Sequence, residues 1–245
     1  MKMFCSLLAA VFAGTALLAA DAAPAADNKG LVLHLPLNEG AGDVVKDIGP
    51  NKRTGKIYYM NAGASWDAGR EEGKALRING VNGKAPFVAI GGFKPDEFSN
   101  GMTVMCYFKP DKDKYIRSSV WHLIASNRSN KGFLLAIHYE RLLLGGDGNR
   151  LTKHAASVNT KNPIRGGEWV HLAATHDGKG VFKVYIDGAL AGTSSEKMCG
   201  PVTPSAGSIA IGSFFGYSPM QGVISDVKVY NKTLSDAEIM DLATD

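Results

Sequence analysis

Aromatic side chains close to turns are the residues of this sequence with the clearest chemical use. Tyrosine and tryptophan rings offer flat apolar faces with a polar edge, which suits the stacking of sugar rings. Two clusters, Tyr58-Tyr59 and Phe214-Phe215-Gly216-Tyr217, lie in or beside predicted loops, so we expect one member of each to face solvent. The predicted carbohydrate-binding residues are Tyr58, Tyr59, Trp121, Tyr139 and Tyr217. The alternative is that these rings only fill a core.

Several other kinds of chemistry have no matching pattern in the sequence. His171 and His176 are five residues apart in one predicted strand, and this odd separation places them on opposite faces, so they do not predict a metal cluster. No G-x-S-x-G element and no glycine-rich phosphate loop between a strand and a helix is present. The net charge of +4 comes from 27 basic and 23 acidic residues without a basic block, which gives no case for a nucleic-acid partner.

The stretch from Gly167 to Thr193 indicates most clearly which elements position these side chains. Its residues alternate between two faces on either side of His176-Asp177-Gly178, and Asp187-Gly188 leads into a third strand. Asp-Gly favours the turns whose twist suits a hairpin, because glycine adopts positive φ without a Cβ clash. The stretch therefore predicts antiparallel strands of a β-sandwich.

The rest of the chain agrees with an all-β fold of one domain. With 245 residues, 45% hydrophobic residues and 29 glycines, it has enough material for a sandwich core with many turns. A capping box, Ser235-Asp236-Ala237-Glu238, predicts a short final helix. Further strands are expected at 31–37, 85–90, 102–108, 121–126, 132–139, 142–144, 154–158, 208–212 and 221–231.

The N-terminus has the pattern of an export signal. Lys2 precedes the apolar run Leu7 to Leu18, which is about a dozen residues long and too short to span a bilayer. Small residues at Ala20-Asp21-Ala22 and Ala23-Pro24-Ala25 fit signal cleavage. We expect a signal peptide at 1–22, a linker at 23–30 and one domain at 31–245. The mature chain would then have no membrane span and would be secreted, periplasmic or attached to the cell surface.

The mature chain would keep two cysteines, Cys106 and Cys199, after Cys5 leaves with the signal segment. Export permits a disulfide bond between them. The sequence leaves two possibilities open, because it does not show whether their Cα atoms come within about 4.4–6.8 Å. Either the two cysteines pair, or Cys106 is simply buried in its strand.

Four motifs in order resemble laminin G-like domains of the concanavalin A-like lectin/glucanase superfamily, in their bacterial form. The central motif runs from Trp169 to Gly178 (WVHLAATHDG) and is followed by Tyr185-Ile186-Asp187-Gly188. The others are the 44–57 region, the 66–80 region with its Trp, Gly and Ala-Leu residues, and the closing strand 221–231. The resemblance covers roughly residues 31–245 and implies a jelly-roll of two antiparallel sheets with a short C-terminal helix.

The resemblance also has implications for enzymes and metals. Laminarinase-type hydrolases of this fold carry E-x-D-x-x-E on one strand, which directs the acids into one cleft. None of the glutamates after the signal segment has an aspartate two residues later. Many laminin G-like domains hold one Ca²⁺, and Asp47 and Asp226 match aspartate-bearing motifs of the family, so they are the predicted ligands. The alternative is an Asx-turn at Asp47 and a surface contact at Asp226.

The sequence thus predicts an exported, non-catalytic module that binds a glycan or polysaccharide. Two alternatives from other classes are a protein-interaction or surface-structural module, with a surface protein as partner, and a divergent polysaccharide-active enzyme. One sandwich architecture hosts all three functions, so the fold alone does not choose among them.

Overall fold

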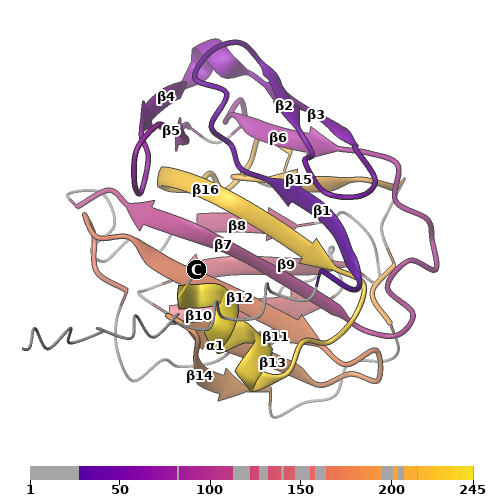
Figure 1. Cartoon of the computed structure of the whole chain (residues 1–245). Coiled ribbons are helices and arrows are strands. Elements are labelled where there is room, and N and C mark those ends of the chain that lie inside the picture. The colour runs from indigo at the N-terminus through magenta and orange to yellow at the C-terminus, as the bar shows by residue number, and fades with distance from the viewer. Residues whose placement is uncertain are drawn as a thin grey trace, which may run out of the picture.

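The computed structural model consists mostly of strands in two antiparallel sheets, with one short helix close to the C-terminus (Figure 1). The predicted signal peptide and most of the linker lie outside the described residues. No helix within the described part of the chain is long and apolar enough to cross a membrane. The structure describes residues 28–81, 83–112, 122–126, 132–138, 141–146, 155–157, 164–194, 201–203, 207–213 and 215–244.

The described residues form eight strands in each sheet. The first sheet has the order β14-β13-β12-β7-β16-β5-β4, with β1 also paired to β16. Its strands are β1 (Leu31–Leu35), β4 (Ala64–Ala68), β5 (Lys74–Asn79), β7 (Met102–Pro110), β12 (Val170–His176), β13 (Phe182–Ile186), β14 (Ala189–Thr193) and β16 (Gln221–Tyr230).

The second sheet lies behind the first in Figure 1 and has the order β11-β10-β9-β8-β15-β6-β3-β2. A short 3-10 helix, η1 (Met60–Ala62), follows its strand β3. The strands are β2 (Val44–Lys46), β3 (Thr54–Tyr58), β6 (Phe87–Ile90), β8 (His122–Ser126), β9 (Phe133–His138), β10 (Arg141–Gly146), β11 (Ala155–Ser157) and β15 (Ile209–Ile211).

The main core lies between the two sheets, because alternate residues of each strand point inward. Leu33 and Leu35 of β1 belong with Val88 and Ile90 of β6 to one buried apolar cluster. Cys106 belongs to the same cluster as a free, buried thiol, and burial raises its pKa. Cys199 lies outside the described residues. The predicted jelly-roll sandwich is confirmed.

The central strand β16 changes partner halfway along its length. Its first half pairs with β5 and its second half with β1, while β7 follows it on the other side. The pairing with β7 shifts register between Ser225 and Lys228, and Asp226 in this gap has a left-handed backbone with φ of 51°. A bulge at this point turns the Asp226 side chain to the outer face of the first sheet, beside His34 of β1.

The helix α1 (Asp236–Thr244) covers the outer face of the first sheet, in front of β7, β12 and β13 (Figure 1). Ile239 and Leu242 are its buried residues. They pack on a second apolar cluster that includes Met105 and Tyr185. This second core explains why strands at the centre of the first sheet are buried on both faces.

The predicted capping box is present at the start of α1. The Ser235 hydroxyl accepts the Glu238 N–H at 3.2 Å, and the Glu238 carboxylate accepts the Ser235 N–H at 2.7 Å. Lys232 donates a hydrogen bond to the same carboxylate at 2.8 Å. The Lys232 bond, together with the Ser235 amide, lowers the pKa of Glu238 to about 2.

Replacing Ser235 by alanine is expected to lower the free energy of unfolding by about 1 kcal/mol, because a helix N–H loses its acceptor. The folded pKa of Glu238 lies below its ordinary value of about 4.3, so its contribution is present above that pH and is lost as the pH falls towards 2. Urea denaturation of the wild type, Ser235→Ala and Glu238→Gln across this pH window measures both effects. A wild type and a Glu238→Gln variant with equal pH dependence would contradict the assignment.

Candidate binding site

Four aromatic rings gather where β3 ends and β6 begins, and Tyr217 follows in the loop that supplies one of them. We call these five residues the aromatic patch: Tyr58, Tyr59, Phe87, Phe215 and Tyr217. Tyr58 lies directly opposite Phe87, and their rings stack with centroids 5.1 Å apart and planes at 10°. Opposed residues of neighbouring strands share a face, whereas the adjacent Ile57 and Val88 point into the core. The stacked rings therefore stand on the outer face of the second sheet.

Phe87 is the buried support of the aromatic patch. Its residue is only 6% exposed, whereas Tyr58, Tyr59 and Tyr217 are 45%, 49% and 58% exposed. The Tyr59 ring lies 6.2 Å from that of Phe87, and the Phe215 ring meets it edge-on at 5.4 Å. The patch thus combines one buried ring with three tyrosines that are about half exposed.

Backbone hydrogen bonds hold the two loops of the patch together. The Gly216 carbonyl accepts the N–H groups of Gly83 at 2.9 Å and of Ala85 at 3.1 Å, and the Gly216 N–H donates to the Ser213 hydroxyl at 3.0 Å. A Cβ at Gly216 would lie 3.5 Å from the Tyr59 ring. These contacts place Gly216, the residue before Tyr217, against the Tyr59 ring, although the two segments are far apart in the sequence.

The patch also contains an unusual amount of backbone strain. Tyr59, Phe215 and Ser218 have left-handed backbones, with φ of 55°, 49° and 48°. Large side chains rarely adopt this conformation, and each such residue costs about 1–3 kcal/mol unless its surroundings impose it. Strain of this kind concentrates at ligand-binding sites, so its position here supports a functional role for the patch.

The structure brings two of the five predicted carbohydrate-binding residues, Tyr58 and Tyr59, together on the Phe87 ring, and it places the loop that carries Tyr217 beside Tyr59. Trp121 and Tyr139 lie outside the described residues. Sequence reasoning missed Phe87, which it placed in a strand without assigning it a face. The signal was available, because Val88 and Ile90 alternate as core residues and leave a phenylalanine on the outward face.

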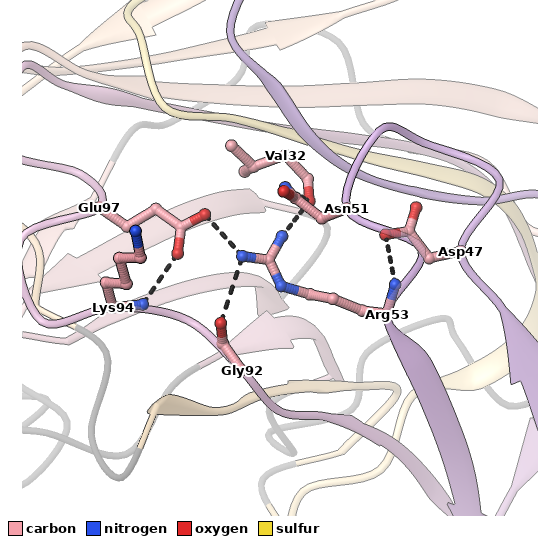
Figure 2. Close-up of polar contacts among 7 residues, drawn as sticks. All are labelled: Val32, Asp47, Asn51, Arg53, Gly92, Lys94 and Glu97. Carbon is pink, nitrogen blue, oxygen red and sulfur yellow. Dashed lines mark hydrogen bonds and ion pairs between the residues drawn. The ribbon is translucent and has the colours of Figure 1, made fainter.

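The predicted metal ligand Asp47 is 4% exposed, and the bonds to its carboxylate in the described region all come from backbone N–H groups. Figure 2 shows the one from Arg53. Asp47 Oδ1 accepts the N–H groups of His34 at 2.9 Å and of Gly49 at 2.7 Å, and its Oδ2 accepts the Arg53 N–H at 3.0 Å. The bond to Gly49, two residues along the chain, makes an Asx-turn. Asp47 thereby fixes the 47–53 loop against β1.

The second predicted ligand, Asp226, forms an ionic cluster with His34 and Lys228. Its Oδ1 lies 2.5 Å from His34 Nε2, and its Oδ2 lies 2.9 Å from Lys228 Nζ. Burial opposes ionisation of this carboxyl, but the His34 hydrogen bond and the Lys228 charge prevail and lower its pKa to about 2. His34 and Lys228 are directly paired in the β1–β16 ladder, so this cluster joins the first strand to the last.

Asp47 and Asp226 in this arrangement do not fit a calcium ion. Ca²⁺ needs about 6–8 oxygen ligands, and both oxygens of each carboxylate already accept bonds from protein donors. Lys228 places a positive charge where the ion would need negative charge. Among the residues that the structure describes, no group of three or more His, Cys, Asp or Glu side chains could hold a metal ion. Calcium binding by the chain stays a prediction from the sequence.

His171 and His176 occupy opposite faces of β12, as their spacing predicts. The His171 ring meets Tyr107 edge-on at 5.1 Å beneath α1, and burial, together with the Lys228 charge, lowers its pKa to about 4. His176 packs on Phe182 in the core at 4.3 Å. Both are 2% exposed, so they act in packing.

A second candidate location is a hollow of about 460 Å³ beside the start of β1. His34 contributes a fixed imidazole to it, and Ile48 contributes a side chain that is 53% exposed. Its volume falls in the range of small-ligand pockets. The lining residues are Asn28, Leu31, His34, Ile48, Gly49, Pro50 and Lys52.

Comparison with known families identifies the class of protein. The profile of the concanavalin A-like lectin/glucanases superfamily matches residues 82–240, which is more than half of the chain. The chain therefore belongs to this superfamily, as the sequence motifs predicted. Among curated proteins, mouse pappalysin-1 is 35% identical over 86 residues, but the match covers 31% of this chain and only 5% of pappalysin-1.

Solved structures support the same fold. The binding domain of botulinum neurotoxin DC, solved in complex with SialylT and with rat synaptotagmin II, superposes with TM-scores of 0.66 and 0.65 at 14% identity. The binding domain of Paraclostridial mosquitocidal protein 1 gives 0.66 at 16% identity. These matches cover 88–89% of this chain and 52% of the relatives, so the chain spans about half of their length.

Proposed function

We propose that this protein is an exported, non-catalytic module that binds carbohydrate through the aromatic patch. The observation that carries the proposal is the pair of half-exposed tyrosines, Tyr58 and Tyr59, on the buried Phe87 ring, with exposed Tyr217 in the adjoining loop and left-handed backbone at Tyr59 and Phe215. Sugar rings present C–H groups on their faces and hydroxyls at their edges. Tyrosines match both features, because each combines an apolar face with a hydroxyl.

Two further observations support a glycan ligand. The chain belongs to a superfamily named for lectins and glucanases, and one related toxin domain was solved in complex with SialylT. The tyrosines of the patch are about half exposed, so affinity per site is expected to be weak. Small polar ligands gain little free energy after the costs of ordering and desolvation.

The proposal of a module without catalytic activity rests on the acids near the patch. Glycoside hydrolysis needs two carboxyl groups roughly 5–10 Å apart across the scissile bond. Asp43 is an acidic residue beside this end of β3, and its carboxylate is engaged with Lys56 Nζ at 3.7 Å. The absence of the E-x-D-x-x-E pattern agrees with this reading.

Export is proposed from the N-terminal sequence alone. We place cleavage near Ala23 or Ala26, after the apolar run that ends at Leu18. Mass spectrometry of the secreted protein should find a chain that starts at one of these residues. Secreted protein with an intact Met1 would overturn the proposal.

Replacing Tyr217 or Tyr59 by alanine is expected to weaken glycan binding about tenfold, which corresponds to ~1.4 kcal/mol, because a stacking face is lost. Binding would be measured first on a glycan array and then by titration with the strongest binder. Leu190→Ala is the matched control, because Leu190 is a 46% exposed apolar residue on β14 of the other sheet. Equal binding by the tyrosine and leucine variants would remove the patch as the site.

The same experiment separates the alternative functions. Saturable binding without turnover supports the module, whereas release of reducing sugar from a polysaccharide would support the divergent enzyme. A protein that binds no glycan but captures a specific surface protein would support the protein-interaction module.

A further inference from the structure

The outer face of the second sheet carries positive charge next to the aromatic patch. Lys56 lies two residues before Tyr58 on β3, so both side chains stand on this face, and Lys56 Nζ lies 6.0 Å from the centre of the Tyr58 ring. Val44 of β2 is directly opposite Lys56, and Lys46 follows on the same exposed face. The lysines thus continue the surface that the tyrosines begin.

A further lysine borders the patch on its other side. Lys84 is exposed in the loop whose flanking residues, Gly83 and Ala85, donate their N–H groups to Gly216. This loop is therefore fixed against the segment that carries Phe215 and Tyr217. In the described parts of β2, β3 and this loop, the basic side chains are Lys46, Lys56 and Lys84.

Two acidic residues lie beside these lysines: Glu39 accepts the Lys46 N–H at 2.8 Å, and Asp43 pairs with Lys56. The Asp43 carboxylate is 3.7 Å from Lys56 Nζ, with the two side chains 50% and 59% exposed. A pair this exposed contributes little free energy, because water and salt screen it and both side chains lose freedom. An anionic ligand could therefore replace Asp43 as the partner of Lys56 at small cost.

We infer that the glycan is acidic, and that Lys56 binds a carboxylate or sulfate group of a sugar whose ring stacks on Tyr58. This inference rests on the proposed function and adds the chemical class of its ligand. The stacking face supplies contact area, and the ammonium group supplies selectivity, because a charged acceptor forms a stronger hydrogen bond than a neutral one. Lys84 occupies the opposite border and serves neighbouring acidic sugars of the same chain.

The test compares acidic glycans with uncharged counterparts of the same sugar and linkage, such as polygalacturonate and its methyl ester, together with the acidic and neutral pairs of an array. We expect the glycans that bind to be the acidic members. Their affinity should fall as sodium chloride rises from about 50 mM to about 500 mM. Lys56→Gln should weaken binding of the acidic glycan about fivefold and bring its affinity closer to that of the uncharged counterpart.

Lys179→Gln is the matched control, because Lys179 is exposed in the turn between β12 and β13 of the first sheet. Lys84→Gln gives a second variant if Lys56→Gln is poorly folded. Equal binding of acidic and neutral members, or equal effects of Lys56→Gln and Lys179→Gln, would overturn the inference while the carbohydrate module stands. An array without any bound glycan would overturn the proposed function and the inference with it.

Discussion

Replacing Arg53 by alanine is expected to lower the free energy of unfolding by about 3–5 kcal/mol, because it leaves a buried carboxylate without its cation. Arg53 Nη2 lies 2.7 Å from Glu97 Oε1, and the two side chains are only 11% and 9% exposed. The same guanidinium donates to the carbonyls of Val32 and Gly92 and lies 4.2 Å above the Phe93 ring. Figure 2 shows how these bonds tie the 47–53 loop to β1 and to the 92–97 loop.

Urea denaturation measures this effect, and two variants control it. Lys183→Ala removes a surface pair with Asp236 whose side chains are 36% and 56% exposed, so it should destabilise the fold far less than Arg53→Ala does. The double variant Arg53→Ala/Glu97→Ala should be less destabilised than the sum of the single variants, because neither charge is left alone. An Arg53→Ala variant no less stable than Lys183→Ala would show that the buried ion pair does not hold the loops.

Replacing Gly63 by alanine is expected to have a similarly large effect, about 3 kcal/mol or more. Gly63 has φ of 129°, which side chains rarely adopt, and a Cβ there would lie 1.5 Å from the Asn79 carbonyl oxygen. Backbone cannot move aside as a flexible side chain can, so the strain of the conformation adds to that of the clash. Tyr59 precedes η1 and Gly63 ends it, so a displaced Gly63 would also displace Tyr59. We therefore also expect weaker glycan binding by this variant.

Gly73→Ala separates the strain of the backbone conformation from the steric clash. Gly73 also has positive φ, at 101°, but nothing lies within 4 Å of the added Cβ. That variant should therefore cost only about 1 kcal/mol, the strain of the conformation alone. Thermal and urea denaturation of both variants give the comparison, and equal stability of the two would contradict the close approach of Gly63 to β5.

The fold was predictable because its central elements obey simple periodicities. The 167–193 stretch became β12, β13 and β14 with the expected hairpin pairing, and the capping box at Ser235 became the start of α1. The strands β2 to β5 were not predicted as strands. They are short, partly exposed and interrupted by glycines, and their identity as strands comes from pairing with β6 and β16 far along the chain.

The site was predictable only in part, for a related reason. Adjacent aromatic residues beside loops indicated Tyr58, Tyr59 and Tyr217. The approach of the loop that carries Tyr217 to Tyr59, however, depends on the hydrogen bonds from Gly83 and Ala85 to Gly216, a contact across more than a hundred residues. The ionic cluster around Asp226 was not predictable from the sequence for the same reason. His34 and Lys228 become neighbours only through the pairing of β1 with β16, which local patterns do not specify.

The most direct test of the central claim is chemical-shift mapping by NMR during titration of the ¹⁵N-labelled chain with the strongest glycan from the array. We predict that the largest shifts fall on 56–61, 83–87 and 215–218, which surround the Phe87 ring. Shifts centred instead on His34, Ile48 and Lys52 would contradict the account and place the ligand in the hollow beside β1.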